Sequence, residues 1–189
     1  MTLFASDELE LEHLLLELPS REELHALREA GLPRQMELDM RFLVKVAMIR
    51  YQPEARFNFD GNGVRAFVLP VRDAYEAVID LAAWRIDRPD KVARLEGRAS
   101  CLGEGLLEAP ETYFGGRPLS VYRDAMGWLR AAGQGVVIID RANAWRRFLE
   151  VPSIAGEDTQ HGLELQTLLT PPVPSCRVLV PASYGRLAA

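Results

Sequence analysis

Short apolar runs alternate with helical stretches over residues 119–169, and this alternation limits the possible folds more than any other feature. Apolar runs at 119–122 and 136–139 flank a helical stretch at 125–132, which Gly133 ends. Strands that alternate with helices of about ten residues are typical of a parallel sheet with helices on its faces. We therefore predict that the two apolar runs are parallel neighbours joined by the helix between them.

The alternation continues toward the C-terminus. A helix is predicted at 144–149, a short strand at 152–155, and a further helix that ends at Leu169. The apolar run at 178–181 predicts a final strand. These elements would extend the parallel sheet on the C-terminal side.

The region before residue 119 has the pattern of antiparallel strands. Apolar and polar residues alternate over 56–59, and apolar runs cover 64–71 and 78–84. The tetrapeptide Asp-Gly-Asn-Gly at 60–63 is a strong hairpin signal between the first two runs. The polar stretch at 87–98 is typical of a loop. We therefore predict an antiparallel meander.

The N-terminal segment is predicted to be helical and acidic. Ser20 and Glu23 form a capping-box pattern at the start of its second helix. A third helical stretch, with its apolar residues on one face over 36–47, is stopped by Pro53. Residues 1–40 hold ten acids and three arginines, a net charge of −7, whereas the remainder carries +2. The overall charge of −5 therefore comes from this segment.

Composition excludes several classes of protein. With 48% apolar and 26% charged residues, the chain can bury a core. No apolar run approaches the roughly 20 residues needed to span a bilayer, and the first residues lack the basic region of a signal peptide. Cys101 and Cys176 have no partner motif, which indicates reduced thiols. We expect a cytoplasmic protein without a membrane segment.

Four side chains are candidates for catalysis or metal binding. Asp140 follows an apolar strand, where parallel sheets bind ligands, although an aspartate there also caps helices. Glu157 and Asp158 could bind a metal, or they could favour the dipole of a helix N-terminus. His161 is more typical of a solvated loop histidine than of a catalytic base.

Several stretches carry a resemblance to a known family. Residues 67–73 end a strand with Pro-Val-Arg-Asp before another apolar strand, and Leu102-Gly103 follows. A strand, helix and glycine lie at 119–133, and Glu157-Asp158 precedes Gly162. In this order the features resemble the Toprim-containing catalytic core of bacterial-type DNA primases, over about 60% of the chain.

The resemblance implies that key acids are replaced. Toprim enzymes hold Mg²⁺ with carboxylates that also serve acid–base roles in phosphoryl or nucleotidyl transfer. The place of the family's catalytic glutamate holds Tyr122-Arg123 here, and the place of its Asp-x-Asp pair holds Glu157-x-Thr159, or Asp158 if one residue is inserted. Because an arginine repels a cation, we expect no cofactor and no tight Mg²⁺ site.

The fold class that follows is α/β. It comprises an N-terminal helical segment (1–52), an antiparallel β-meander (53–112) and a small Toprim-like parallel sheet with flanking helices (113–189). The leading functional hypothesis is a non-catalytic, primase-like accessory or binding factor in nucleic-acid metabolism. Its partners would be single-stranded nucleic acid or replication proteins.

Two alternatives remain open. One is a Mg²⁺-dependent phosphotransferase or nuclease that uses Glu157, Asp158 and Asp140. The other is an acidic module that docks on a basic protein or mimics nucleic acid. If the chain binds nucleic acid, the residues expected to contact it flank the predicted sheet ends, and they are Arg94, Arg98, Arg117, Arg123 and Arg141. The sequence indicates no oligomeric state.

Overall fold

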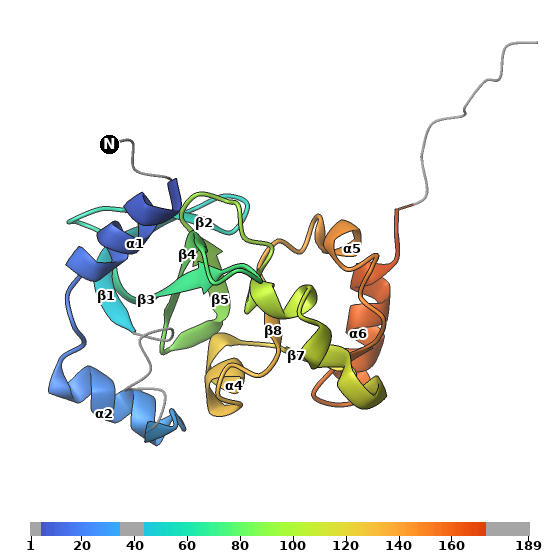
Figure 1. Ribbon diagram of the computed structural model, residues 1–189. Helices are drawn as coiled ribbons and strands as arrows, with labels where there is room; N and C mark the ends of the chain where they lie inside the picture. The colour runs from blue at the N-terminus through green and yellow to red at the C-terminus, as the bar shows by residue number, and fades with distance from the viewer. Residues whose placement is uncertain (1–4, 35–43, 173–189) are drawn as a thin grey trace, which may run out of the picture.

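The computed structural model describes residues 5–34 and 44–172, and it shows a β-barrel beside a smaller α/β sheet (Figure 1). The barrel strands are β1 (Lys45–Gln52), β2 (Arg56–Phe59), β3 (Val64–Arg72), β4 (Val78–Arg85) and β5 (Arg88–Arg94). The second sheet comprises β6 (Cys101–Leu102), β7 (Leu119–Tyr122), β8 (Val136–Ile138) and β9 (Ile154–Ala155). The helices are α1 (Ala5–Leu15), α2 (Arg21–Glu29), α4 (Ala125–Arg130), α5 (Ala144–Arg147), α6 (Thr159–Leu169) and the 3-10 helices η2 (Glu104–Leu107) and η3 (Pro110–Gly116). Within the described ranges, no helix has the length and apolar character that crossing a membrane requires.

The strand pairing of the barrel corrects the predicted simple meander. β2 and β3 lie on opposite sides of β1, in the order β1-β2-β5-β4-β3. The turn at 60–63 therefore carries the chain past the end of β1 and does not form a β2–β3 hairpin. Gly63 passes so close to Ile49 that a Cβ would lie 2.1 Å from the Ile49 carbonyl oxygen. A parallel bridge between Arg56 and Arg94 joins β2 to β5 and closes the barrel.

Strand β1 lies where the sequence predicts a helix. The helix predicted to run on to Pro53 is wrong from Lys45 onward, and residues 35–43 lie outside the described part of the chain. Val46 packs in a cluster with Trp84, whereas Ile49 packs in a second cluster beneath α1. Because both faces of β1 are covered, its apolar residues lose the period of two that marks a half-exposed strand.

Strand β5 corrects the loop predicted at 87–98. Its first residues are polar and largely exposed, and only the last three, at 92–94, are buried. The sequence of β5 therefore contains no apolar run that would predict a strand. The strand forms because its backbone pairs with β4 and β2.

The second sheet confirms the main prediction from the alternating pattern. β7 pairs with β8 in parallel, and α4 connects them. β9 adds to the other side of β7, also in parallel, whereas β6 pairs antiparallel with β8. The strand predicted at 178–181 lies outside the described residues, and the segment boundaries at 52/53 and 112/113 stay predictions.

The N-terminal helices belong to the barrel's packing. Leu9 of α1 is 5% exposed and packs in the cluster beneath that helix. The ammonium group of Lys45 donates to the carbonyl oxygens of Leu14 and Leu16, at 3.1 Å each, which satisfies the C-terminal end of α1. His13 at the end of α1 is 3% exposed, and its Nε2 lies 3.4 Å from the carbonyl oxygen of Val68.

A buried carboxylate holds the chain where it leaves the barrel. The Asp80 side chain on β4 is fully buried and accepts four backbone hydrogen bonds. Its Oδ1 accepts from Leu81 and Glu96 at 2.9 and 2.8 Å, and its Oδ2 accepts from Arg98 and Ala99 at 2.7 and 3.0 Å. Both oxygens therefore bind the backbone of the segment that leads from β5 to β6.

We expect Asp80→Asn to destabilise the protein by about 2 kcal/mol or more, because the amide NH₂ would face buried N–H donors and leave them unsatisfied. Denaturant unfolding measures this change. Asp73→Asn is the matched control: its Oδ1 alone accepts from Tyr75 and Ala77 in an exposed turn, so an amide oxygen can replace it at a cost of about 1 kcal/mol or less. Equal losses in the two variants would contradict this role of Asp80.

Candidate functional site

An arginine and two acids meet at the carboxyl ends of β7 and β9. These strands are parallel neighbours, so Arg123 after β7 and Glu157 and Asp158 after β9 reach the same edge of the sheet. The Nη1 and Nη2 atoms of Arg123 lie 2.7 and 3.0 Å from the Oδ2 and Oδ1 atoms of Asp158. The backbone N–H of Arg123 donates to Oε2 of Glu157 at 3.0 Å, and Nη1 lies 3.6 Å from the same oxygen.

This bidentate contact shifts the pKa of Asp158. Hydrogen bonds from Arg123 hold the pKa of Asp158 well below its usual range, and in return raise the pKa of Arg123. Oδ1 of Asp158 also accepts from the backbone N–H of His161 at 2.8 Å and caps α6. Asp158 therefore pairs with the Arg123 guanidinium and caps α6 at the same time.

Tyr122 occupies a packing position. Its half-buried ring lies against the core cluster that contains Trp128. A Cβ at Gly135 would lie 2.7 Å from its Cε2 atom, and one at Gly127 would lie 3.5 Å from its Cδ1 atom. Gly135 thus makes room for the tyrosine where the family resemblance places a catalytic glutamate, whereas the Gly127 distance is an ordinary van der Waals contact.

Asp140 has its own cation. Its Oδ2 lies 3.0 Å from Nη2 of Arg94, and Asn143 donates to its carboxylate at 3.1 and 3.3 Å. Burial alone would raise the pKa of Asp140, but the hydrogen bonds from Asn143 and Arg94 outweigh it and lower that pKa. Arg94 is itself 7% exposed and also donates to the carbonyl oxygen of Ala99. Arg94 therefore links the barrel to the second sheet and is not a surface residue.

The candidate acids do not form one cluster. Asp140 is bound by Arg94, whereas Glu157 and Asp158 are bound by Arg123. Among the residues described, His, Cys, Asp and Glu side chains nowhere gather in threes as a metal site requires. Whether the chain binds Mg²⁺ stays a prediction, for which titration is the test.

His161 is buried, which its loop-like sequence context does not indicate. It lies in the first turn of α6 and is 5% exposed. Its Nδ1 accepts from the backbone N–H of Glu157 at 3.2 Å, so the proton of the neutral ring is on Nε2. Burial, and then the charge of Arg123, lower the pKa of His161.

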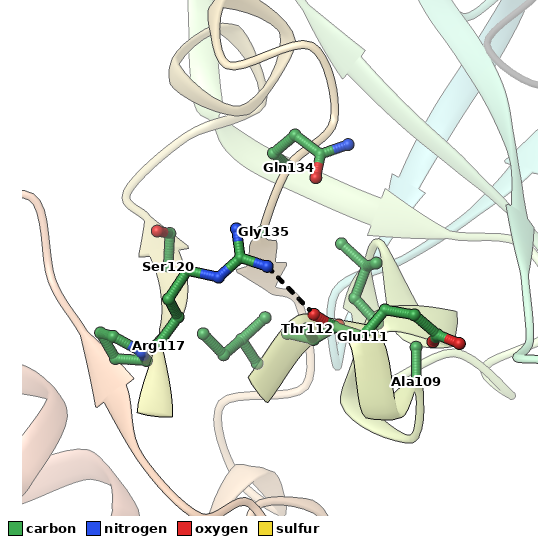
Figure 2. A pocket seen from close by; sticks show the side chains of 10 residues that line it. Ala109, Glu111, Thr112, Arg117, Ser120, Gln134 and Gly135 are labelled. Atoms are coloured by element: carbon green, nitrogen blue, oxygen red, sulfur yellow. Dashed lines mark hydrogen bonds between the residues drawn. The ribbon is translucent and has the colours of Figure 1, made fainter. Parts of the chain in front are cut away.

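The remaining candidate arginines are dispersed. Arg98 forms a long, exposed contact of 3.8 Å with Glu96. Arg117 precedes β7, at the opposite end from Arg123, and its guanidinium donates to the carbonyl oxygens of Phe114 and Glu111 at 3.1 and 3.4 Å. Figure 2 shows it reaching across a hollow of about 420 Å³ between η3 and β7.

Arg141 follows β8 and is exposed. Within the described ranges, its guanidinium has no hydrogen-bond or ion-pair partner. Arg117 and Arg141 are thus the two candidates that carry an exposed charge without a carboxylate partner.

A barrel followed by an α/β sheet with parallel central strands defines a primase-like fold. Two solved structures share it. The first is the Aquifex aeolicus primase (zinc-binding and RNA polymerase domains), with a TM-score of 0.56 at 14% identity over 87% of this chain and 51% of that one. The second is a DnaG primase catalytic domain bound to ssDNA, with a TM-score of 0.50 at 13% identity over 86% of this chain and 65% of that one.

The chain therefore spans about half the length of the first primase and just under two thirds of the second. No protein-family model matches this sequence, and no curated protein does. At these identities the similarity shows a primase-like fold.

The charge of Arg123 should be detectable in the titration of His161. Arg123→Gln removes a cation that lowers the pKa of His161 and leaves Glu157, Glu164 and Asp158, which raise it, so we expect that pKa to rise. Nitrogen-resolved NMR of the imidazole measures it, and Arg50→Gln on β1 is the charge-matched control. An unchanged His161 pKa in Arg123→Gln would contradict this arrangement.

The same shift predicts a pH dependence of stability. The native pKa of His161 lies below the unfolded value of about 6.5, so its contribution is fully present above that pH. It is lost as the pH falls from about 6.5 toward the native pKa. Across this pH window, the free energy of unfolding should decrease in both the wild type and Arg123→Gln. The decrease should be smaller in Arg123→Gln, because its His161 pKa lies closer to the unfolded value.

Proposed function

We propose that the chain is a non-catalytic, primase-like protein that binds single-stranded nucleic acid as an accessory factor. The observation that carries this proposal is the contact of Arg123 with both oxygens of Asp158. A divalent cation needs several oxygen ligands at about 2.0–2.6 Å, and carboxylates are its main protein ligands. Here a guanidinium occupies those oxygens, and it would repel an approaching metal ion.

The fold and two exposed charges support the nucleic-acid part of the proposal. One primase of similar fold is bound to ssDNA. Arg117 and Arg141 are exposed and have no carboxylate partner in the described part of the chain, so they can pair with phosphates. Affinity for nucleic acid comes mainly from neutralised phosphates. With Arg94 and Arg123 already paired with acids, we expect weak binding.

A specific observation also favours the protein-interaction alternative. α1 contributes Leu9 to the core, yet its opposite face is apolar as well. Leu11, Leu14 and Leu15 are 50%, 47% and 78% exposed, and Leu18 just beyond the helix is 65% exposed. Exposed apolar surface flanked by acids is typical of a site for a basic, apolar partner. This candidate becomes the leading one if the chain does not bind nucleic acid.

Titration with Mn²⁺ tests the metal part of the proposal. We expect no stoichiometric site of micromolar affinity in the wild type, because Arg123 blocks the acid pair. The double variant Tyr122→Glu/Arg123→Gly removes that cation and adds a carboxylate, so it should gain heat of binding in calorimetry. Arg141→Gly likewise removes one arginine charge, but it adds no carboxylate and leaves the acid pair closed, so it should behave like the wild type. A micromolar site in the wild type would instead support the phosphotransferase alternative.

Fluorescence anisotropy with a labelled single-stranded oligonucleotide tests the nucleic-acid part. Affinity should fall with salt. The slope of log K against log salt should be roughly −0.7 for each phosphate neutralised on a single strand, and therefore about −1.4 at most if Arg117 and Arg141 both contact phosphates. Arg117→Ala should reduce the slope by about 0.7. Arg50→Ala, which removes an arginine paired with Asp60 on the barrel, should leave it unchanged. No binding at low salt would end the nucleic-acid hypothesis.

A further inference from the structure

A small pocket lies at the carboxyl ends of β7 and β8, where α6 covers the sheet. Its volume is about 270 Å³. The apolar lining comes from both strands and from α6, and it consists of Val121, Ile138, Leu165 and Leu168. The carboxyl edge of parallel strands is the usual place for ligands in open α/β sheets.

His161 presents an unused donor to this pocket. Its side chain is 7% exposed and lines the pocket. Nδ1 accepts from the backbone N–H of Glu157, so Nε2 carries the proton, and Nε2 has no hydrogen-bond acceptor among residues 5–34 and 44–172. Nε2 is not one of the fully buried atoms that lack a partner, so it opens onto the pocket. An acceptor on a ligand in the pocket can therefore accept from this N–H.

The charges around the pocket favour an uncharged ligand. Arg141 and Arg123 face it together with Glu164 and Asp90, so cations and anions are equal in number. Arg123 is already neutralised by Asp158. A phosphate would gain from Arg141 but would be repelled by two carboxylates. A neutral molecule with both hydrogen-bond acceptors and donors on its edge could pair with the arginines and with the carboxylates.

Size and lining narrow the ligand further. Pockets for drug-sized ligands hold roughly 300–1,000 Å³, so about 270 Å³ suits one heterocyclic base and not a dinucleotide. Apolar walls suit the flat faces of such a ring. Among the bases, guanine has two acceptors, O6 and N7, that arginine recognises, and it has donors at N1 and N2 that a carboxylate can accept.

We propose that this pocket binds a guanine base. Arg141 and the Nε2–H of His161 donate to the acceptor edge, and the half-exposed carboxylate of Glu164 accepts from N1 and N2. This inference rests on the proposed function in one respect: the base would come from a single strand that the protein binds. It assigns the site to base recognition, without a metal.

Calorimetry or NMR titration of the full-length protein with guanosine tests the pocket without any phosphate. We expect guanosine to bind, adenosine to bind about fivefold more weakly or worse, and inorganic phosphate not to bind. Glu164→Gln should lower guanosine affinity by about fivefold or more, since a well-placed contact to a base edge is worth that much. Arg141→Gln should do the same. Glu150→Gln, an exposed acid outside the pocket, is the matched control and should have no effect.

Three outcomes would overturn the proposal: no guanosine binding at millimolar concentration, equal binding of guanosine and adenosine, or guanosine affinity unchanged in both pocket variants. Oligonucleotide anisotropy separates these from failure of the proposed function. Strand binding that depends on Arg117 without guanosine binding would refute the base pocket alone. Guanosine binding with the predicted variant effects, but without strand binding, would support the pocket and refute the proposed nucleic-acid role.

Discussion

The carboxylate of Asp80 fixes the point at which the chain passes from the barrel to the second sheet. Four backbone N–H groups converge on it, three of them from residues 96–99. A second tie runs from Arg94 at the end of β5 to Asp140 after β8. Buried polar groups that satisfy one another in this way favour one arrangement over its competitors. The position of β8, and hence of β7 and β9 beside it, follows from these two ties.

The acid pair after β9 shows how a cation can be built into a fold. A bound divalent cation needs several oxygen ligands that are free to coordinate it. Arg123 is fixed by the backbone of β7, and its planar fork matches both oxygens of one carboxylate. Gly135 leaves room for the ring of Tyr122 beside it. The local sequence is thus adapted to an ion pair and an aromatic ring.

The sequence predicts those parts of this structure that depend on local pattern. The parallel pair β7 and β8 follows from apolar runs separated by a helix, and the cap at Asp158 follows from an acid before a helix. Closure of the barrel could not be predicted, because β5 is polar where it is exposed and β1 is covered on both faces. Likewise, the partner of Arg123 depends on the register between β7 and β9, which are separated in the chain by α4, β8 and α5. Burial of His161 depends on how α6 packs, which no single residue indicates.

The short outer strands of the second sheet bear on how copies of this protein can associate. β6 and β9, which form its two edges, contain two residues each, and the barrel is closed. Long, open strand edges are what allow chains to add to one another's sheets, and very short edges prevent this. Self-assembly by strand addition is therefore disfavoured at these edges. Among residues 5–34 and 44–172, side-chain surfaces such as the outer face of α1 are therefore the favoured places for association.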